Sequence, residues 1–429
     1  MNVLILFLLY SFLFSNSFSY LILPFETKID EIELDSSNFY QKKYYNIIQT
    51  NFTLGTPNQK IPLSIMIKQY PIVITSKYSN LDISNLFDQK KSNSYKELKK
   101  NPLRSWELIY KECYFGNDIF SIINNSKETK NEELNFLLGT EMGNKLNGLL
   151  GLSIKSTRDD LNEYGFLLQL KQKKLIESKI FYFEFDLKNN NKGELIIGKY
   201  PHEINSKKYK EIDFLTISSY NPIYIDEFSF NFNSIYYGDQ LIQEMGITYL
   251  EIEKNFIQAS ESFGNIITKN FFSKFVEEGL CKEIQLEVVF YSYICDKNIN
   301  LKEFKEIKFN LKNVNFTFSL NSKDLFYEMD NKLYFLIYYT KINGNTWSFG
   351  KIFFNKYFLV FDSEKKLIGF YKKINEEGIF LKIFLTILCI GGFLVLMFFL
   401  LRFLVNKYYG KGKKNILIEK ILLQEKLIK

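Results

Sequence analysis

Short runs of alternating apolar and polar residues fill the chain between about residue 20 and residue 374. The runs are rich in Ile, Phe and Tyr, and clusters of Asn, Lys, Gly and Ser separate them. Alternation among β-branched and aromatic residues predicts β-strands. The clearest runs are 45–54, 63–74, 180–185, 194–197, 228–232, 314–320 and 332–339. The body of the protein is therefore expected to be mainly β.

Helical spacing of apolar residues is confined to a few places. Apolar residues recur at three- and four-residue intervals in 161–173 and 265–278, which predicts a helix in each segment. The polar stretch 84–101 predicts a loop, and the Asn, Lys and Gly residues of 188–193 predict a hairpin turn. No short-period repeat is present in the sequence, so a solenoid or a propeller is not expected.

Two largely apolar segments without charged residues stand near the ends of the sequence. Residues 3–14, followed by small residues at 15–19, are typical of a secretory signal peptide, which we place at 1–19. An uncleaved membrane anchor is the alternative interpretation of this segment. Residues 383–401 are almost entirely apolar, carry no charge and approach the roughly 20 residues that a membrane-spanning helix needs. With its flanks, this segment predicts a transmembrane helix at 379–405.

Charged residues around the second apolar segment predict its orientation. Glu376 and Glu377 precede it, and lysines follow it at 407, 411, 413 and 414. Because positive residues favour the cytoplasmic side, residues 406–429 are expected to form a cytoplasmic tail. The body is then lumenal or extracellular. The sequence predicts a single-pass type I membrane protein of the secretory pathway or the cell surface.

Cysteines and glycosylation sequons agree with a secretory route. Cys281 and Cys295 enclose a short loop and are predicted to form a disulfide. Cys389 lies in the apolar segment, and Cys113 has no evident partner in the sequence. The three Asn-x-Ser/Thr sequons, which predict N-glycosylation, begin at Asn51, Asn124 and Asn315.

Composition excludes several function classes. The formal net charge of +7 is small for 429 residues, and Lys and Glu are interspersed, so nucleic-acid binding is not expected. His202 is the only histidine, which disfavours catalytic triads and His-based zinc sites and predicts no metal. No Gly-rich phosphate loop is present, and no cofactor is predicted.

Several segments, taken together in their order, resemble the pepsin family of aspartic peptidases over about residues 40–373. The resemblance implies a bilobal pepsin-like (acid protease) fold, with lobes placed at 20–210 and 211–374. The segments that carry it are Leu54-Gly55-Thr56-Pro57, Gly148-Leu149-Leu150-Gly151-Leu152, residues 166–176, Ile180-Phe181-Tyr182-Phe183, residues 193–198, Trp347-Ser348-Phe349-Gly350, residues 357–362 and Ile368-Gly369-Phe370.

The family's two catalytic aspartates have no counterpart of the same kind here. In the first lobe Met66 stands where the resemblance implies an aspartate, and Ile67-Lys68-Gln69 replaces the Thr-Gly-Ser that follows in the family. In the second lobe Glu251 is the best surrogate for the aspartate, with Glu253 next. A solvated strand edge with alternating Glu and Ile is an equally good interpretation of this segment.

Two further residues are interpreted through the same resemblance. Tyr110 stands at the position of the family's flap tyrosine, which implies a role in closing over a ligand. Asp362 stands in a segment that is structural in the family, so we interpret it as a strand-end or turn acid. His202 follows Pro201 in a polar turn and is expected to be a surface residue.

Three functional hypotheses follow. The first is a catalytically inactive aspartic protease homologue whose cleft, lined by Met66, Tyr110 and the region of Glu251, binds an extended peptide or a protein segment. The second is an active membrane-bound aspartic endopeptidase with a divergent site. The third is a structural surface protein whose cleft is filled by its own side chains. The missing aspartates favour the first, because both carboxylates take part in the family's chemistry.

Overall fold

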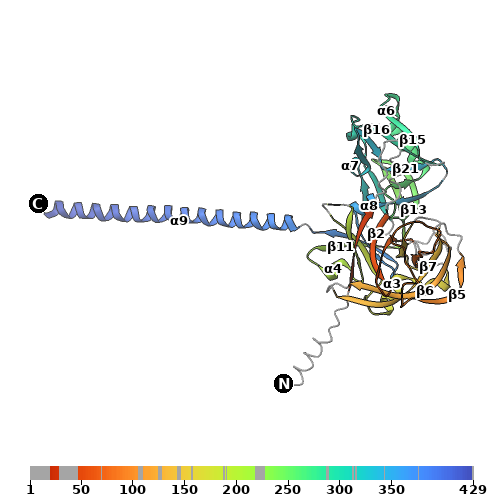
Figure 1. Ribbon diagram of the computed structural model, residues 1–429. Coiled ribbons are helices and arrows are strands. Elements are labelled where there is room, and N and C mark those ends of the chain that lie inside the picture. The colour runs from red at the N-terminus through yellow and green to blue at the C-terminus, as the bar shows by residue number, and fades with distance from the viewer. Residues whose placement is uncertain are drawn as a thin grey trace, which may run out of the picture. The chain divides into compact units, whose positions relative to one another are not determined.

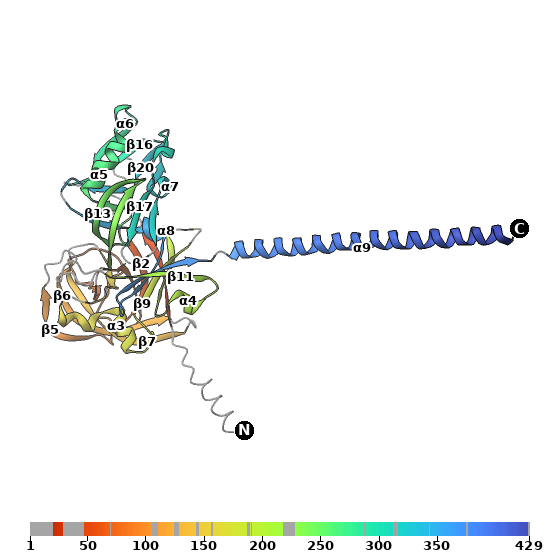
Figure 2. The same cartoon turned by 180° about the vertical axis from the view of Figure 1, so that it is seen from behind.

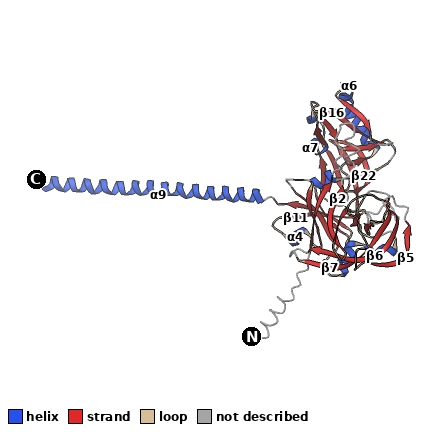
Figure 3. Ribbon diagram, viewed as in Figure 1, coloured by secondary structure: helices blue, strands red, loops and turns tan. Residues whose placement is uncertain are grey.

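The computed structural model describes residues 20–28, 47–68, 70–104, 110–123, 128–142, 146–155, 158–186, 189, 191–217, 228–286, 289–311, 314, 316–342, 344–374 and 376–427. The chain divides into two compact units, Met1–Lys372 and Lys373–Lys429. The first unit is built mostly of strands, as Figure 3 shows, which confirms the mainly β, pepsin-like class.

Alternation of apolar residues places strands with one face in the core. In β2 (Ile47–Leu54), for example, Ile48, Thr50, Phe52 and Leu54 are buried while Asn51 is exposed. Side chains on a strand point alternately to its two faces, so such a strand can bury one face against the core and present the other to solvent. The period of the sequence pattern therefore fixes which side chains form the interior.

The first sheet combines strands from both ends of the unit. Its order is β11-β24-β23-β9-β10-β1-β2-β3-β8-β4-β7-β6-β5. The bounds are β1 Leu21–Lys28, β2 Ile47–Leu54, β3 Gln59–Met66, β4 Ile72–Thr75, β5 Lys96–Arg104, β6 Tyr110–Ile123, β7 Thr129–Met142, β8 Gly148–Gly151, β9 Ile180–Phe185, β10 Lys192–Ile197, β11 Tyr209–Thr216, β23 Phe358–Asp362 and β24 Leu367–Lys373.

The second sheet is formed by the strands between β11 and β23 in the sequence. Its order is β18-β17-β12-β13-β22-β14-β21-β16-β20-β19, and β15 pairs with β16. Figures 1 and 2 both place β16 and α6 (Ser273–Glu277) at the opposite end of the first unit from β5 and β6. The bounds are β12 Ser229–Tyr237, β13 Gln240–Leu250, β14 Ile257–Ala259, β15 Cys281–Gln285, β16 Phe290–Asp296, β17 Ile307–Leu311, β18 Thr317–Leu320, β19 Phe326–Met329, β20 Lys332–Phe335, β21 Ile337–Thr340 and β22 Thr346–Phe349.

Helices in the first unit are short. The α-helices are α3 Phe166–Gln172, α4 Pro201–Ile204, α5 Glu261–Ile267, α6 Ser273–Glu277, α7 Ser322–Leu325 and α8 Lys351–Lys356. A π-helical turn, η4 (Thr268–Phe272), joins α5 to α6, so the helix predicted at 265–278 begins earlier and is not regular throughout. The 3₁₀ helices are η2 Asp159–Tyr164 and η5 Leu301–Glu303.

The helix predicted at 161–173 is interrupted at Gly165. Gly165 has an extended backbone and forms an isolated β-bridge with Pro71. A Cβ at this position would lie 2.3 Å from the Tyr70 ring, so glycine is the residue that fits against that ring. The apolar spacing of the segment continues across the break, which is why the sequence alone predicted one helix.

Two further predictions were wrong in detail. The apolar run 63–74 is not one strand, because the chain turns between Met66 and Ile72 and contributes to β3 and β4. Residues 96–101, expected in a loop, belong to the edge strand β5. Edge strands often carry lysines that discourage further pairing, so its polar sequence is compatible with a strand. The hairpin predicted at 188–193 is confirmed by the antiparallel pairing of β9 with β10.

Aromatic side chains fill much of the core. The rings of Phe181 and Phe361 are stacked with centroids 4.9 Å apart, and Phe228 meets Phe361 edge-on at 4.7 Å. Trp347 is fully buried, and its indole Nε1 donates to Gln243 Oε1 at 3.1 Å. Ring pairs of this kind add to the stabilisation that burial alone gives. Many of the 43 phenylalanines therefore have a structural explanation.

The predicted disulfide between Cys281 and Cys295 is confirmed. The two residues are direct partners across the antiparallel pair β15 and β16. Cys113 is buried on β6, and Cys389 is an exposed free thiol on the C-terminal helix.

The second unit is described by one helix, α9 (Glu376–Leu427). Within it, Thr386–Leu404 is long and apolar enough to cross a membrane, and its side chains are not buried by the protein. The predicted apolar segment, 383–401, overlaps this range. The helix continues through residues that the sequence assigned to a separate tail, so no break marks position 406.

Candidate functional site

Two loops follow equivalent strands in the two sheets. In the first sheet, β3 runs parallel to β8, with Met66 opposite Gly151, and the Leu152 amide donates to the Met66 carbonyl at 2.9 Å. In the second sheet, β13 runs parallel to β22, with Leu250 opposite Phe349. The next residue, Glu251, donates its amide to the Phe349 carbonyl at 2.9 Å.

The strands that follow keep the same register. Ile72 of β4 pairs with Leu150, six residues after Met66 (72 − 66). Ile257 of β14 pairs with Phe349, six residues after Glu251 (257 − 251). Met66 and Glu251 therefore occupy equivalent positions in a repeated arrangement of three strands and a loop.

Gly350 holds the Glu251 loop close to β22. A Cβ on Gly350 would lie 2.3 Å from the carbonyl oxygens of both Lys254 and Phe256. The Lys351 amide donates to the same Lys254 carbonyl at 2.6 Å. Because the obstructing atoms are backbone atoms, a larger residue at 350 would displace the loop that carries Glu251.

Replacing Gly350 by alanine is expected to lower the free energy of unfolding by about 2 kcal/mol through overpacking. Urea unfolding monitored by tryptophan fluorescence measures the change. Gly344→Ala is the matched control, because its new methyl group would meet only the Ile342 carbonyl at 3.8 Å. Equal stability of the two variants would show that the loop moves without cost.

Lys68 and Glu251 join the two loops. The Lys68 ammonium donates to Glu251 Oε1, and the Lys254 ammonium contacts Glu251 Oε2. The side chain of Glu251 is 5% exposed, whereas that of Lys254 is 15% and that of Lys68 is 27% exposed. The Lys68 Nζ also lies 5.7 Å from the centre of the Tyr249 ring. A buried carboxylate is thus held between two ammonium groups from different loops.

The two glutamates of the second loop differ in their protonation. Burial acts to raise the pKa of Glu251, but the Lys68 and Lys254 ammonium groups outweigh it, so this pKa is lowered. Burial raises the pKa of Glu253 to about 7, and the charge of Glu251 adds to the effect. The Oε2 atom of Glu253 is buried and has no hydrogen-bond partner in the part of the chain that the structure describes, although the residue as a whole is partly exposed.

Met66 contributes no polar atom to this arrangement. Its partly buried side chain packs against a small hydrophobic cluster that includes Val73, Leu149 and Tyr164. The structure therefore brings Glu251 together with Lys68, rather than with a second carboxylate from the first loop. Lys68 was visible in the sequence as the replacement of a motif glycine, but its partner was not.

Tyr110 begins β6, and its side chain lies outside what the structure describes. β5 and β6 form an antiparallel hairpin in which Leu103 is opposite Cys113. Cys113 is fully buried in the same cluster as Leu103.

Of the three sequons, Asn51 is exposed on β2, while Asn124 and Asn315 lie outside the described residues. Glycosylation at all three positions stays a prediction.

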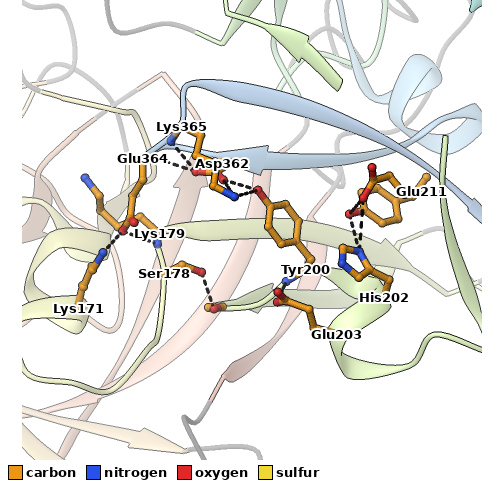
Figure 4. A network of polar contacts seen from close by, with 12 residues as sticks. Lys171, Ser178, Lys179, Tyr200, His202, Glu203, Glu211, Asp362, Glu364 and Lys365 are labelled. Atoms are coloured by element: carbon orange, nitrogen blue, oxygen red, sulfur yellow. Dashed lines mark hydrogen bonds and ion pairs between the residues drawn. The ribbon is translucent and has the colours of Figure 1, made fainter. Parts of the chain in front are cut away.

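Asp362 is a turn acid on the first sheet (Figure 4). Its Oδ1 accepts the backbone amides of Glu364 and Lys365 at 2.9 and 2.8 Å, and the Tyr200 hydroxyl donates to its Oδ2. The two amide contacts lie within the turn, and the third contact comes from Tyr200, which immediately precedes α4. The Asp362 carboxylate therefore has a structural role, as its position in the sequence suggested.

His202 is more constrained than the sequence predicted. Its ring stacks between Tyr200 and Tyr371, with centroids 5.4 and 5.7 Å away. Its Nδ1 lies 2.8 Å from the Tyr371 hydroxyl. A Glu211 oxygen lies 3.8 Å from the same atom, and Figure 4 draws His202 beside Glu211. The side chain is about one-third exposed, at 37%. A single histidine in a polar turn gave no signal for this packing.

A separate hollow of about 520 Å³ lies in the second lobe. Inside it Glu283 pairs with Lys341 at 3.0 Å and accepts a hydrogen bond from Tyr339. Its lining residues are Asn265, Thr268, Lys269, Ser273, Val276, Glu277, Glu283, Tyr293, Tyr339 and Lys341. None of them belongs to the two loops. Within the described residues, no group of three or more His, Cys, Asp or Glu side chains could hold a metal ion.

The fold and the paired loops define a bilobal β protein of the aspartic peptidase class. A sequence model of the eukaryotic aspartyl protease family matches residues 43–373, which is most of the chain. The chain belongs to the eukaryotic aspartyl protease family. Among curated proteins, none matches this chain.

Proposed function

We propose that this chain is a membrane-anchored member of the aspartyl protease family that has no peptidase activity and binds an extended peptide between its lobes. The observation that carries the proposal is the Lys68–Glu251 bridge, which stands where the family's mechanism requires two facing carboxylates. Met66 supplies no carboxylate from the first loop.

The chemistry of the bridge opposes the family's reaction. A general base must accept a proton from water at the operating pH, and its efficiency falls as its pKa falls below that pH. Glu251 has a lowered pKa and is held by two ammonium groups, so it is a weak base. The sequence of the facing loop, residues 67–71, contains no Asp or Glu that could hold the shared proton.

Peptide binding does not need the lost carboxylates. An extended peptide is recognised through backbone hydrogen bonds to strand edges and through pockets for alternate side chains. The β5–β6 hairpin keeps the pairing expected of a flap, and the equivalent loops keep their register. These features support the proposal that the protein binds peptides but does not cleave them.

Membrane attachment and location form part of the proposal. The helical segment Thr386–Leu404 is compatible with a single span, and the Cys281–Cys295 disulfide is typical of an oxidising compartment. We infer a type I orientation in the secretory pathway or at the cell surface, from the lysines that follow the span. A glycosidase-induced shift of the full-length protein on a gel would test the lumenal placement of Asn51, Asn124 and Asn315.

A peptidase assay tests the central claim. The full-length protein in detergent micelles would be incubated with a diverse peptide pool from about pH 3 to about pH 7, with and without a transition-state-analogue inhibitor of aspartic peptidases. We expect no inhibitor-sensitive cleavage at any pH. The Glu251→Gln variant is the matched control, because it keeps the shape of the side chain and removes its charge.

One observation favours the alternative, an active endopeptidase with a divergent site. Glu251 and Glu253 are close enough for the charge of Glu251 to raise the pKa of Glu253, so two interacting carboxylates do exist on one loop. If that pair were catalytic, inhibitor-sensitive cleavage would appear in the wild-type protein and vanish in Glu251→Gln. That result would refute the inactive assignment.

A further inference from the structure

The net charge of the side chains that join the two loops differs in sign from the net charge of a site with two paired carboxylates. Lys68 and Lys254 contribute two ammonium groups, and Glu251 contributes one carboxylate. Glu253, with its pKa of about 7, is mostly uncharged in acidic solution. The group therefore carries a net positive charge there, whereas two carboxylates that share one proton carry a net negative charge.

Lys68 is the member of this group that can change its partner. It is the most exposed of the three bridged side chains, at 27% against 15% for Lys254 and 5% for Glu251. Glu251 bonds Lys68 through Oε1 and Lys254 through Oε2. If the Lys68 ammonium turned away, Glu251 would still be paired with Lys254, so the movement would not leave a buried carboxylate without a counter-ion.

We propose that Lys68 is a specificity-determining residue that binds a carboxylate of the ligand, so that the site selects acidic peptides. The inference rests on the proposed peptide-binding function. A carboxylate of the ligand would replace Glu251 Oε1 on the ammonium as a charge-assisted hydrogen-bond acceptor. The Tyr249 ring, 5.7 Å from Lys68 Nζ, provides an aromatic surface next to that position.

The carboxylate could belong to an acidic side chain or to the end of a peptide. Three pools of labelled nonapeptides with mixed apolar residues separate these sources. The first has a central Glu and an amidated C-terminus, the second a central Gln and a free C-terminal carboxylate, and the third a central Gln and an amidated C-terminus. Fluorescence anisotropy with the full-length protein in detergent micelles, at about pH 6, measures each dissociation constant.

We expect at least one carboxylate pool to bind about tenfold more tightly than the neutral pool, which corresponds to one charge-assisted contact. The preference should weaken at high salt because the contact is partly exposed. Lys68→Met should abolish the preference but keep binding of the neutral pool. Lys274→Met, which removes a Lys–Glu pair on the surface of the second lobe, is the matched control and should keep the preference.

The outcomes separate the two proposals. Equal binding of all three pools to the wild-type protein overturns the role of Lys68 and leaves peptide binding intact. A preference that persists in Lys68→Met also overturns it. No binding of any pool overturns the proposed function and the inference together. The comparison among pools on the wild-type protein stands even if the Lys68→Met variant does not fold.

Discussion

Replacing Glu251 by alanine is expected to lower the free energy of unfolding by about 3–5 kcal/mol, because it removes one side of a buried ion pair and leaves like charges together. Lys68 and Lys254 would then lack the carboxylate that now lies between them. The effect should be at the lower end of this range, because Lys68 is partly exposed and water can solvate it. Urea unfolding at neutral pH measures the loss.

Two comparison variants identify the cause of that loss. The triple variant Lys68→Met, Glu251→Leu and Lys254→Met removes every charge of the bridge and should recover most of the stability. Glu303→Ala removes an exposed partner of Lys274 and should change stability by less than about 0.5 kcal/mol. A triple variant as unstable as Glu251→Ala would mean that the loss comes from packing and not from charge.

The contribution of Glu253 to the stability of the protein should fall as the pH rises from about 4.5 to about 7. Its pKa is 4.5 in an ordinary environment and about 7 in the folded protein, so the folded state holds more protons than the unfolded state in this window. Excess protons on the folded state make stability decrease with rising pH. The Glu253→Gln variant lacks this titration. Its free energy of unfolding should exceed that of the wild type by about 2–3 kcal/mol at pH 8 and equal it near pH 4.5.

Unfolding midpoints in urea at several pH values test this prediction. Glu277→Gln, which changes an exposed carboxylate on α6, is the control and should follow the wild type at every pH. A constant difference between Glu253→Gln and the wild type across the range would exclude titration of Glu253 as the cause. The pH range in which the stability difference between the two proteins develops reports the pKa of Glu253 in the folded protein.

Most of the fold could be predicted from the sequence because its signals are local. Alternating apolar residues identified strands such as β2, and the predicted run 180–185 coincides with β9. The apolar segment near the C-terminus identified a helix that could span a membrane. Each of these signals lies within one element and is not altered by distant contacts.

Features that depend on distant residues could not be predicted. The break at Gly165 is explained by the Tyr70 ring, 95 residues earlier in the chain (165 − 70). The partner of Lys68 is 183 residues away, on the loop of the other sheet. The sequence showed that Lys68 replaces a motif glycine and that Glu251 is the best surrogate for an aspartate, but it could not show that these two residues pair.

The order of strands in the first sheet determines how a mechanical load would pass through the body. β24, the strand that leads to the C-terminal helix, is linked to β1 through β23, β9 and β10. Every strand of the second sheet is inserted in the sequence between β11 and β23. A tether pulling between α9 and β1 would load the hydrogen bonds that join these strands of the first sheet. The strands of the second sheet, next to which the Glu251 loop lies, are not part of this series of strand pairs.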